Sequence, residues 1–202
     1  MVATERDTPE HRERYALFCA FITAVNASRL VFIDESFCKT GMRRTHAWAP
    51  CGTRARGTKP FRSWKTVSLI GAIRLGRRPL IMTNEGAVNG SIFLRFVKQR
   101  LTPWLQRGDI VVMDNLNFHK MQCVRRAIEA AGAMPIYLPT YSPELNPIEL
   151  LWSDLKRDLR RMGLDTVDML RWAMRRLRAA LPLRRIEGWF RHANEIAEAQ
   201  LK

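Results

Sequence analysis

The sequence is poor in acidic residues. Its 202 residues include 19 Asp and Glu against 34 Lys and Arg, which gives a formal net charge of +15. A shortage of acids on this scale points to a polyanionic partner, with nucleic acid first and an anionic membrane surface second. Hydrophobic residues still make up 47% of the chain and charged residues 26%, which argues against wholesale disorder. The length predicts one large domain, or one domain with an appendage.

Cysteine is scarce and irregularly spaced. The sequence has no Cys-x-x-Cys pair and no Cys/His cluster at zinc spacing among its four cysteines, Cys19, Cys38, Cys51 and Cys123. Cys38, His46 and Cys51 share one loop-rich stretch, but three loose ligands are weak evidence for zinc. Free thiols in a reducing compartment are the better interpretation.

Long hydrophobic runs are also missing. The apolar run Ala16–Val25 is too short to span a bilayer, so no membrane association is predicted from it. The charge before this run is balanced rather than positive, and cleavage after it would start the mature chain inside a strand, so a signal peptide is disfavoured. We therefore predict a cytoplasmic, nucleoid-associated protein that is not secreted.

Hydrophobic periodicity predicts alternating strands and helices. Residues 35–63 are irregular, with a possible short strand at Thr45–Trp48. Strands are expected at 29–33, 65–74, 79–83, 110–113 and 134–138, and helices at 9–26, 91–105, 120–131, from 147 to about 160, and at 166–180 and 184–199. The first three strands fit an antiparallel meander and the later ones a β-α-β pattern, which predicts an α/β fold with a mixed sheet covered by helices.

Two aspartates follow apolar strands where packing alone does not favour an acid. Asp34 follows the strand 29–33 and Asp114 follows the strand 110–113. If these strands lie side by side and parallel, both carboxylates face one crevice, since ligands gather at the carboxyl ends of strands. Two close carboxylates repel each other, and this favours a divalent cation between them.

Spacing alone does not select the third acid. Glu149 lies in the first turn of the helix after a proline-rich loop, but Asn146, Pro147 and Glu149 also fit a capping box that merely holds the helix start. Its rivals as third acid are Glu144, Glu35 and Asp154. An aspartate after a strand is also often only a turn residue, so each assignment has a purely structural alternative.

Basic and aromatic residues are interleaved in the irregular stretch, a pattern typical of a nucleic-acid groove. The basic ones include Arg43, Arg44, Arg62 and Lys65. A solvated basic loop is the alternative explanation. The residues Arg171, Arg175 and Arg178 share one helix face, where they either bind phosphates or remain solvated.

Four motifs together resemble the catalytic domain of mariner-like bacterial insertion-sequence transposases, members of the DDE superfamily of endonucleases. They are 31–36 (VFIDES), 45–52 (THAWAPCG), 112–115 (VMDN) followed by Phe118-His119, and 138–149 (LPTYSPELNPIE) with Trp152. The resemblance runs in order from about residue 29 to 160, and the tail 188–193 (GWFRHA) also fits.

The resemblance implies an RNase H-like fold with a five-stranded mixed sheet and extra C-terminal helices. It also implies that Asp34, Asp114 and Glu149 are the catalytic acids and ligands of Mg²⁺ or Mn²⁺, with two ions expected. The 34 residues between Asp114 and Glu149 match the interval of the family and favour Glu149 over its rivals. Asn115 and His119 are expected to support the acids or to contact DNA, as are the basic residues Arg43, Arg44, Arg62 and Lys65.

The family's N-terminal helix-turn-helix region has no counterpart here. Only about 28 residues precede the first strand, which leaves room for one helix. We therefore expect an N-terminal helix and linker at 1–28 and the catalytic domain at 29–202, with end recognition supplied by a separate part. The expected partners are transposon-end and target DNA and further copies of the chain, as a homodimer or a larger assembly.

The expected activity is metal-dependent phosphodiester hydrolysis at transposon ends, followed by attack of the freed 3′-hydroxyl on target DNA. Two alternatives stay open from the sequence. One is a non-catalytic DNA-binding remnant or regulator, and the other is a general RNase H-like nuclease.

Overall fold

A five-stranded mixed sheet forms the centre of the molecule. The computed structural model describes residues 8–57 and 64–201. The strands lie in the order β3-β2-β1-β4-β5, with β2 antiparallel to both β1 and β3, and with β4 parallel to β1 and β5 parallel to β4. Their bounds are β1 Leu30–Lys39, β2 Thr66–Ile73, β3 Leu80–Glu85, β4 Ile110–Met113 and β5 Met134–Tyr137. This confirms the predicted mixed sheet, and it meets the condition that the strands leading to Asp34 and Asp114 lie side by side and parallel.

Strand β1 is longer than predicted. It runs through Asp34 to Lys39 because β2 pairs with it over that whole stretch, from Phe32 opposite Ile73 to Lys39 opposite Thr66. The pairing with β4 ends earlier, at Phe32. The prediction that the strand stops before Asp34 is therefore wrong, since the antiparallel neighbour holds polar residues in the sheet as well as apolar ones.

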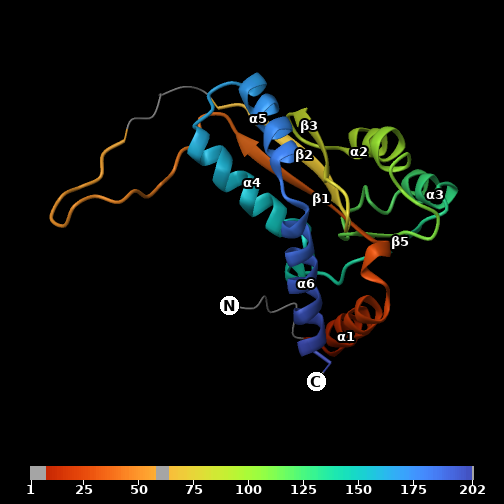
Figure 1. Cartoon of the computed structure of the whole chain (residues 1–202). Helices are drawn as coiled ribbons and strands as arrows, with labels where there is room; N and C mark the ends of the chain where they lie inside the picture. The colour runs from red at the N-terminus through yellow and green to blue at the C-terminus, as the bar shows by residue number, and fades with distance from the viewer. Residues whose placement is uncertain (1–7, 58–63, 202) are drawn as a thin grey trace.

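Helices cover both faces of the sheet (Figure 1). One apolar cluster joins Leu30 and Phe32 to α1, α4, α5 and α6, and a second joins Val31 and Ile33 to α2 and α3. This alternation along β1 is the period of two expected for a strand buried on both faces. The helices are α1 Pro9–Ala24, α2 Gly90–Phe96, α3 Gln122–Ala130, α4 Ile148–Met162, α5 Val167–Ala180 and α6 Leu183–Ala199.

One helix departs from the predicted pattern. The helix expected at 91–105 is α-helical only as far as Phe96 and continues as a π-helical turn, Val97–Leu101. Helix α1 packs in the same apolar cluster as β1, through residues such as Phe18 and Ile22. The division of the chain at residue 28 stays a prediction.

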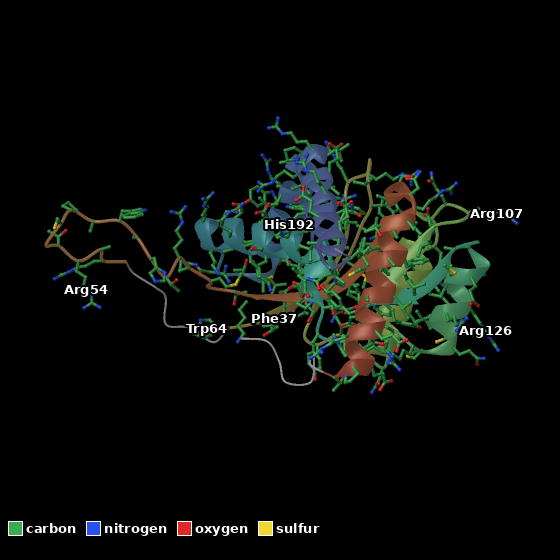
Figure 2. The ribbon with its side chains drawn as sticks, turned by 90° about the horizontal axis from the view of Figure 1, so that it is seen from below. Phe37, Arg54, Trp64, Arg107, Arg126 and His192 are labelled. Atoms are coloured by element: carbon green, nitrogen blue, oxygen red, sulfur yellow. The ribbon has the colours of Figure 1, made fainter. Side chains whose placement is uncertain are left out.

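After β1, the described residues up to 57 extend away from the sheet as a long loop (Figure 1). Figure 2 shows Arg54 far from the sheet on this loop, whereas Phe37 and Trp64 lie near its base. The strand predicted at Thr45–Trp48 is absent from the described part of the loop, because no neighbouring strand pairs with it, and Trp48 is fully exposed. That prediction is wrong.

A buried ion pair closes the amino end of β4. Asp109, directly before the strand, accepts hydrogen bonds from Arg74 at 2.6 and 3.1 Å. Arg74 also donates to the Ser28 carbonyl and to the Gln106 side chain. Within the described ranges 8–57 and 64–201, no helix is long and apolar enough to cross a membrane.

Candidate active site

Asp34 is buried in β1 and is held by a tryptophan from α4. Only 8% of its surface is exposed, and its Oδ2 accepts a hydrogen bond of 2.9 Å from Trp152 Nε1. The indole fits against the sheet because Gly71 lies opposite Asp34 on β2: a Cβ on Gly71 would stand 2.5 Å from the indole ring. Burial, then the charges of Glu149 and Glu35, raise the pKa of Asp34 to about 8. Among residues 8–57 and 64–201, Asp34 thus has no basic side chain that would neutralise its charged form.

Asp114 follows β4 and faces the same region. The register that pairs Phe32 with Val112 brings Asp34 and Asp114, each two residues further on, to the same level. Asp114 Oδ1 accepts from the Leu116 backbone N–H at 3.0 Å and lies 2.5 Å from His119 Nδ1. Burial alone would raise the pKa of Asp114, but these hydrogen bonds and the charge of His119 outweigh it and hold the pKa below its usual range.

His119 bridges two carboxylates. It is fully buried, with Nδ1 at Asp114 and Nε2 2.9 Å from Glu35 Oε1, and its ring packs 4.3 Å from the Phe93 ring. Burial disfavours the imidazolium, but the two acids reverse that effect and raise the pKa of His119 to about 9. The sequence does not predict the contact of Glu35 with His119, since Glu35 is there only a rival for the third acid. A longer β1 would have placed it on the face opposite Asp34.

Glu149 lies in the first turn of α4. Partial burial raises the pKa of its carboxyl, and the positive charge of Lys156 and the negative charge of Asp114 act in opposite directions on it. The predicted capping box is not formed: the N-cap is Pro147 without a side-chain hydrogen bond, and Glu149 contacts Asn146 only through backbone N–H to carbonyl, at 3.1 Å. The Glu149 carboxylate is therefore not used in closing the helix.

Asp34, Asp114 and Glu149 line one open pocket of about 340 Å³, which we call the acid pocket. Its far wall is the loop 138–143, to which Asn115 is tied by a hydrogen bond from its Nδ2 to the Leu138 carbonyl. Tyr141 on this wall is exposed and has a φ of 55°, a left-handed conformation that is uncommon outside glycine and concentrates at functional sites. Sequence analysis missed Tyr141, although it lies inside the motif 138–149.

The pocket offers oxygen donors that fit a divalent cation. Asp34 has its pKa raised to about 8, and the buried Asn146 Oδ1 on the pocket wall has no hydrogen-bond partner among residues 8–57 and 64–201. A cation would stabilise the charged form of Asp34, and an oxygen-only donor set suits Mg²⁺ or Mn²⁺. In the described part of the chain, however, no three acidic, histidine or cysteine side chains stand close enough to hold an ion as they are. Binding would therefore draw the acids together.

The predicted basic residues lie elsewhere. Arg43 forms an ion pair with Asp165 at 2.8 Å, and Lys65 forms one with Glu85 at 3.1 Å. Neither they nor Arg44 line the acid pocket. Arg62 lies outside the described residues. A role of these residues in DNA contact stays a prediction.

Comparison with known proteins identifies the family. The model of the DDE superfamily endonucleases matches residues 29–171. The chain belongs to this family. A search of curated proteins gave no match.

Solved structures of the mariner transposase Mos1 share the fold of this DDE endonuclease. The Mos1 pre-cleavage transpososome superposes with a TM-score of 0.75 at 17% identity, over 96% of this chain and 62% of the Mos1 chain. The Mos1 paired-end complex with Mg gives 0.75 at 19% identity, over 96% and 64%. The isolated Mos1 catalytic domain with Raltegravir and Mg gives 0.67 at 16%, over 96% and 97%. This confirms the RNase H-like fold, and the chain spans less than two thirds of the longer Mos1 chains.

Proposed function

We propose that this DDE endonuclease is the catalytic part of a mariner-like transposase. It hydrolyses a phosphodiester bond at a transposon end, leaving a 3′-hydroxyl, and that hydroxyl then attacks a phosphorus of target DNA and displaces one of its oxygens. The observation that carries the proposal is the meeting of Asp34, Asp114 and Glu149, from three separate elements, in one open pocket of a strongly basic chain. The Mos1 structures, solved as a transpososome and with paired ends, support the choice of DNA as substrate.

Each of the three acids is oriented for cation binding by different neighbours. Asp34 is oriented by Trp152 Nε1, and Asp114 is oriented by His119 and kept ionised by it. Glu149 stands at the start of α4, where it completes the set from a third element. When two divalent ions are bound, they supply activation of water and stabilisation of the leaving oxygen. Asn115 and Tyr141 line the same pocket and are placed to contact the DNA strand.

We also infer that the chain works in the cytoplasm on nucleoid DNA, and as a dimer or larger assembly on it. A separate N-terminal helix-turn-helix part would recognise the transposon ends. Alone, the chain is expected to nick DNA with little sequence preference, because its excess of 15 positive charges binds phosphates without reading bases.

A nicking assay with Mg²⁺ tests the proposal. Asp34→Ala, Asp114→Ala and Glu149→Ala should each lower the nicking rate by at least about 100-fold, while the exposed Glu129→Ala on α3 keeps it. Wild-type rates in all three variants would refute the assignment of the pocket.

Two further measurements separate the alternatives. Mn²⁺ titration by calorimetry should show two-site binding that Asp34→Asn abolishes, and no binding with or without DNA would favour a non-catalytic remnant. Faster cleavage of an RNA–DNA hybrid or a four-way junction than of a transposon-end duplex would instead indicate a general RNase H-like nuclease.

A further inference from the structure

A second pocket, lined by arginines, lies at the free edge of the sheet. It has a volume of about 320 Å³ and is formed by β3, the π-helical turn Val97–Leu101 and α5. Four arginines line it, and the remaining lining residues are uncharged: Arg100, Arg171, Arg175 and Arg178, with Ile81, Met82, Thr83 and Met174. We call it the arginine pocket. It shares no lining residue with the acid pocket.

The positive charge of the arginine pocket is barely offset by the protein. No acid lines it in the described part of the chain, and there its arginines form one ion pair, from Arg171 to Asp168 at 3.4 Å, with the Asp168 side chain 92% exposed. Such an exposed pair contributes little. Arg171 and Arg175 stand four residues apart on α5, a like-charge spacing that destabilises a helix by itself. The arrangement therefore opposes folding slightly and is better explained by an anionic ligand.

The pocket brings the guanidinium groups together from two directions. Arg171, Arg175 and Arg178 come from α5, and Arg178 is fixed by a hydrogen bond of 2.6 Å from its Nε to the Pro79 carbonyl. Arg100 comes from the π-helical turn, a distortion that is often found at functional sites. Apolar neighbours such as Ile81 exclude water from one side and strengthen charge–charge attraction. Paired N–H groups of arginine match the oxygens of a phosphate.

The spacing of the arginines favours a continuous strand of phosphates. Positions 171 to 178 cover about 10 Å along α5 at 1.5 Å per residue, a length over which a nucleic-acid strand presents more than one phosphate. A single carboxylate or free phosphate would engage only part of this row. An extended polyanion can engage all of it.

The two pockets are separated by packed protein. Asp34, Gly71 and Ile81 form one row across β1, β2 and β3, so Ile81 lies two strands from the acids, about 10 Å away between backbones. Between them, Trp152 of α4 packs against Gly71. Phosphates in the arginine pocket therefore do not belong to the nucleotide at the acids.

We propose that the arginine pocket binds the phosphate backbone of DNA at a place distinct from the strand in the acid pocket. This inference rests on DNA being the substrate proposed above. It gives the enzyme a second, sequence-independent hold on the same duplex or on another one.

Anisotropy with a fluorescein-labelled DNA duplex of about 20 base pairs tests this, in EDTA so that no cleavage contributes, from about 50 to 200 mM NaCl. The pair Arg100→Ala and Arg175→Ala should together weaken binding about tenfold and reduce the salt slope by about 2. A control with the same loss of charge is the pair Arg126→Ala and Arg191→Ala, two exposed residues of α3 and α6, which should weaken it by less than about threefold. Figure 2 shows Arg126 at the outer surface.

Equal losses in the two pairs would overturn the proposal, because net charge alone would then explain them. Unchanged DNA affinity with loss of binding to a labelled hexaglutamate peptide would also overturn it in favour of an acidic protein partner. If the alanine pair unfolds in circular dichroism, Arg100→Lys and Arg175→Lys should still weaken DNA binding about threefold, and no weakening refutes the proposal. Loss of nicking in the acid variants is independent of these results, so either proposal can fail alone.

Discussion

Strand β4 has an aspartate at each end, and the two ends differ in the charges that surround them. Asp109 at the amino end is completely buried, and its charge is met by Arg74 and by the Gln106 backbone N–H. Asp114 at the carboxyl end opens on a pocket that it shares with Asp34 and Glu149, where acids outnumber bases. The first end is built for stability, whereas at the second end His119 offsets the charge of Asp114 but Asp34 stays in a state that a proton or a cation would relieve.

The largest effect is expected at the amino end. Arg74→Ala leaves Asp109 as a buried, unpaired charge and should lower the free energy of unfolding by about 3–5 kcal/mol. Urea unfolding measures this loss. Replacing both partners, Arg74→Met with Asp109→Leu, should restore most of the stability, because an apolar pair needs no neutralisation. If Arg74→Ala alone were as stable as the wild type, the ion pair of Arg74 with Asp109 would not stabilise the amino end of β4.

The sequence predicts the difference between these ends only in part. Asp34 and Asp114 are found because each follows an apolar run, but the parallel pairing of β1 with β4 is only a condition of that argument, since β2, β3 and α2 lie between them in the chain. The contact of Glu35 with His119 is not predictable in this way, since it depends on β1 continuing for residues held only by β2. Likewise, nothing local indicates that Arg74 and Asp109, 35 residues apart, form a pair.

At the carboxyl end of β4, removing a charge is expected to raise the free energy of unfolding rather than lower it. The pKa of Asp34 is about 8 in the folded chain against 3.8 for its ordinary value, so the folded state binds the extra proton between about pH 4 and pH 8. Stability therefore falls as the pH rises through that window. Asp34→Asn removes this loss and keeps an acceptor for Trp152.

Without metal, the free energy of unfolding of Asp34→Asn should thus exceed that of the wild type by at least about 1 kcal/mol at pH 7.5. Near pH 4 the variant should have no such advantage. Thermal unfolding in EDTA at the two pH values measures this, with the exposed Glu129→Gln as a control. An advantage of equal size at both pH values would mean that the charge of Asp34 is not the cause.

Metal binding should depend on pH for the same reason. A cation competes with the proton on Asp34, so the affinity for Mn²⁺ should fall up to about tenfold per pH unit below pH 8 and level off above it. That change equals about 1.4 kcal/mol per unit. Calorimetric titration across pH 6 to about 9 measures it. A flat affinity over this range would contradict the strained state of Asp34.

The smallest effect is expected at Glu35, one residue after Asp34 on β1, because its charge acts on Asp34 across the sheet. The charge of Glu35 raises the pKa of Asp34, although Glu35 itself contacts His119 on the other face. Glu35→Gln keeps an acceptor for His119 and removes that charge, so the pH at which Mn²⁺ affinity levels off should move down by less than about one unit. Glu85→Gln, exposed on β3, should leave it in place. An upward shift of this pH would mean that Glu35 acts on Asp34 mainly through His119 and Asp114. The imidazole, rather than direct repulsion between Glu35 and Asp34, would then set the pKa of Asp34.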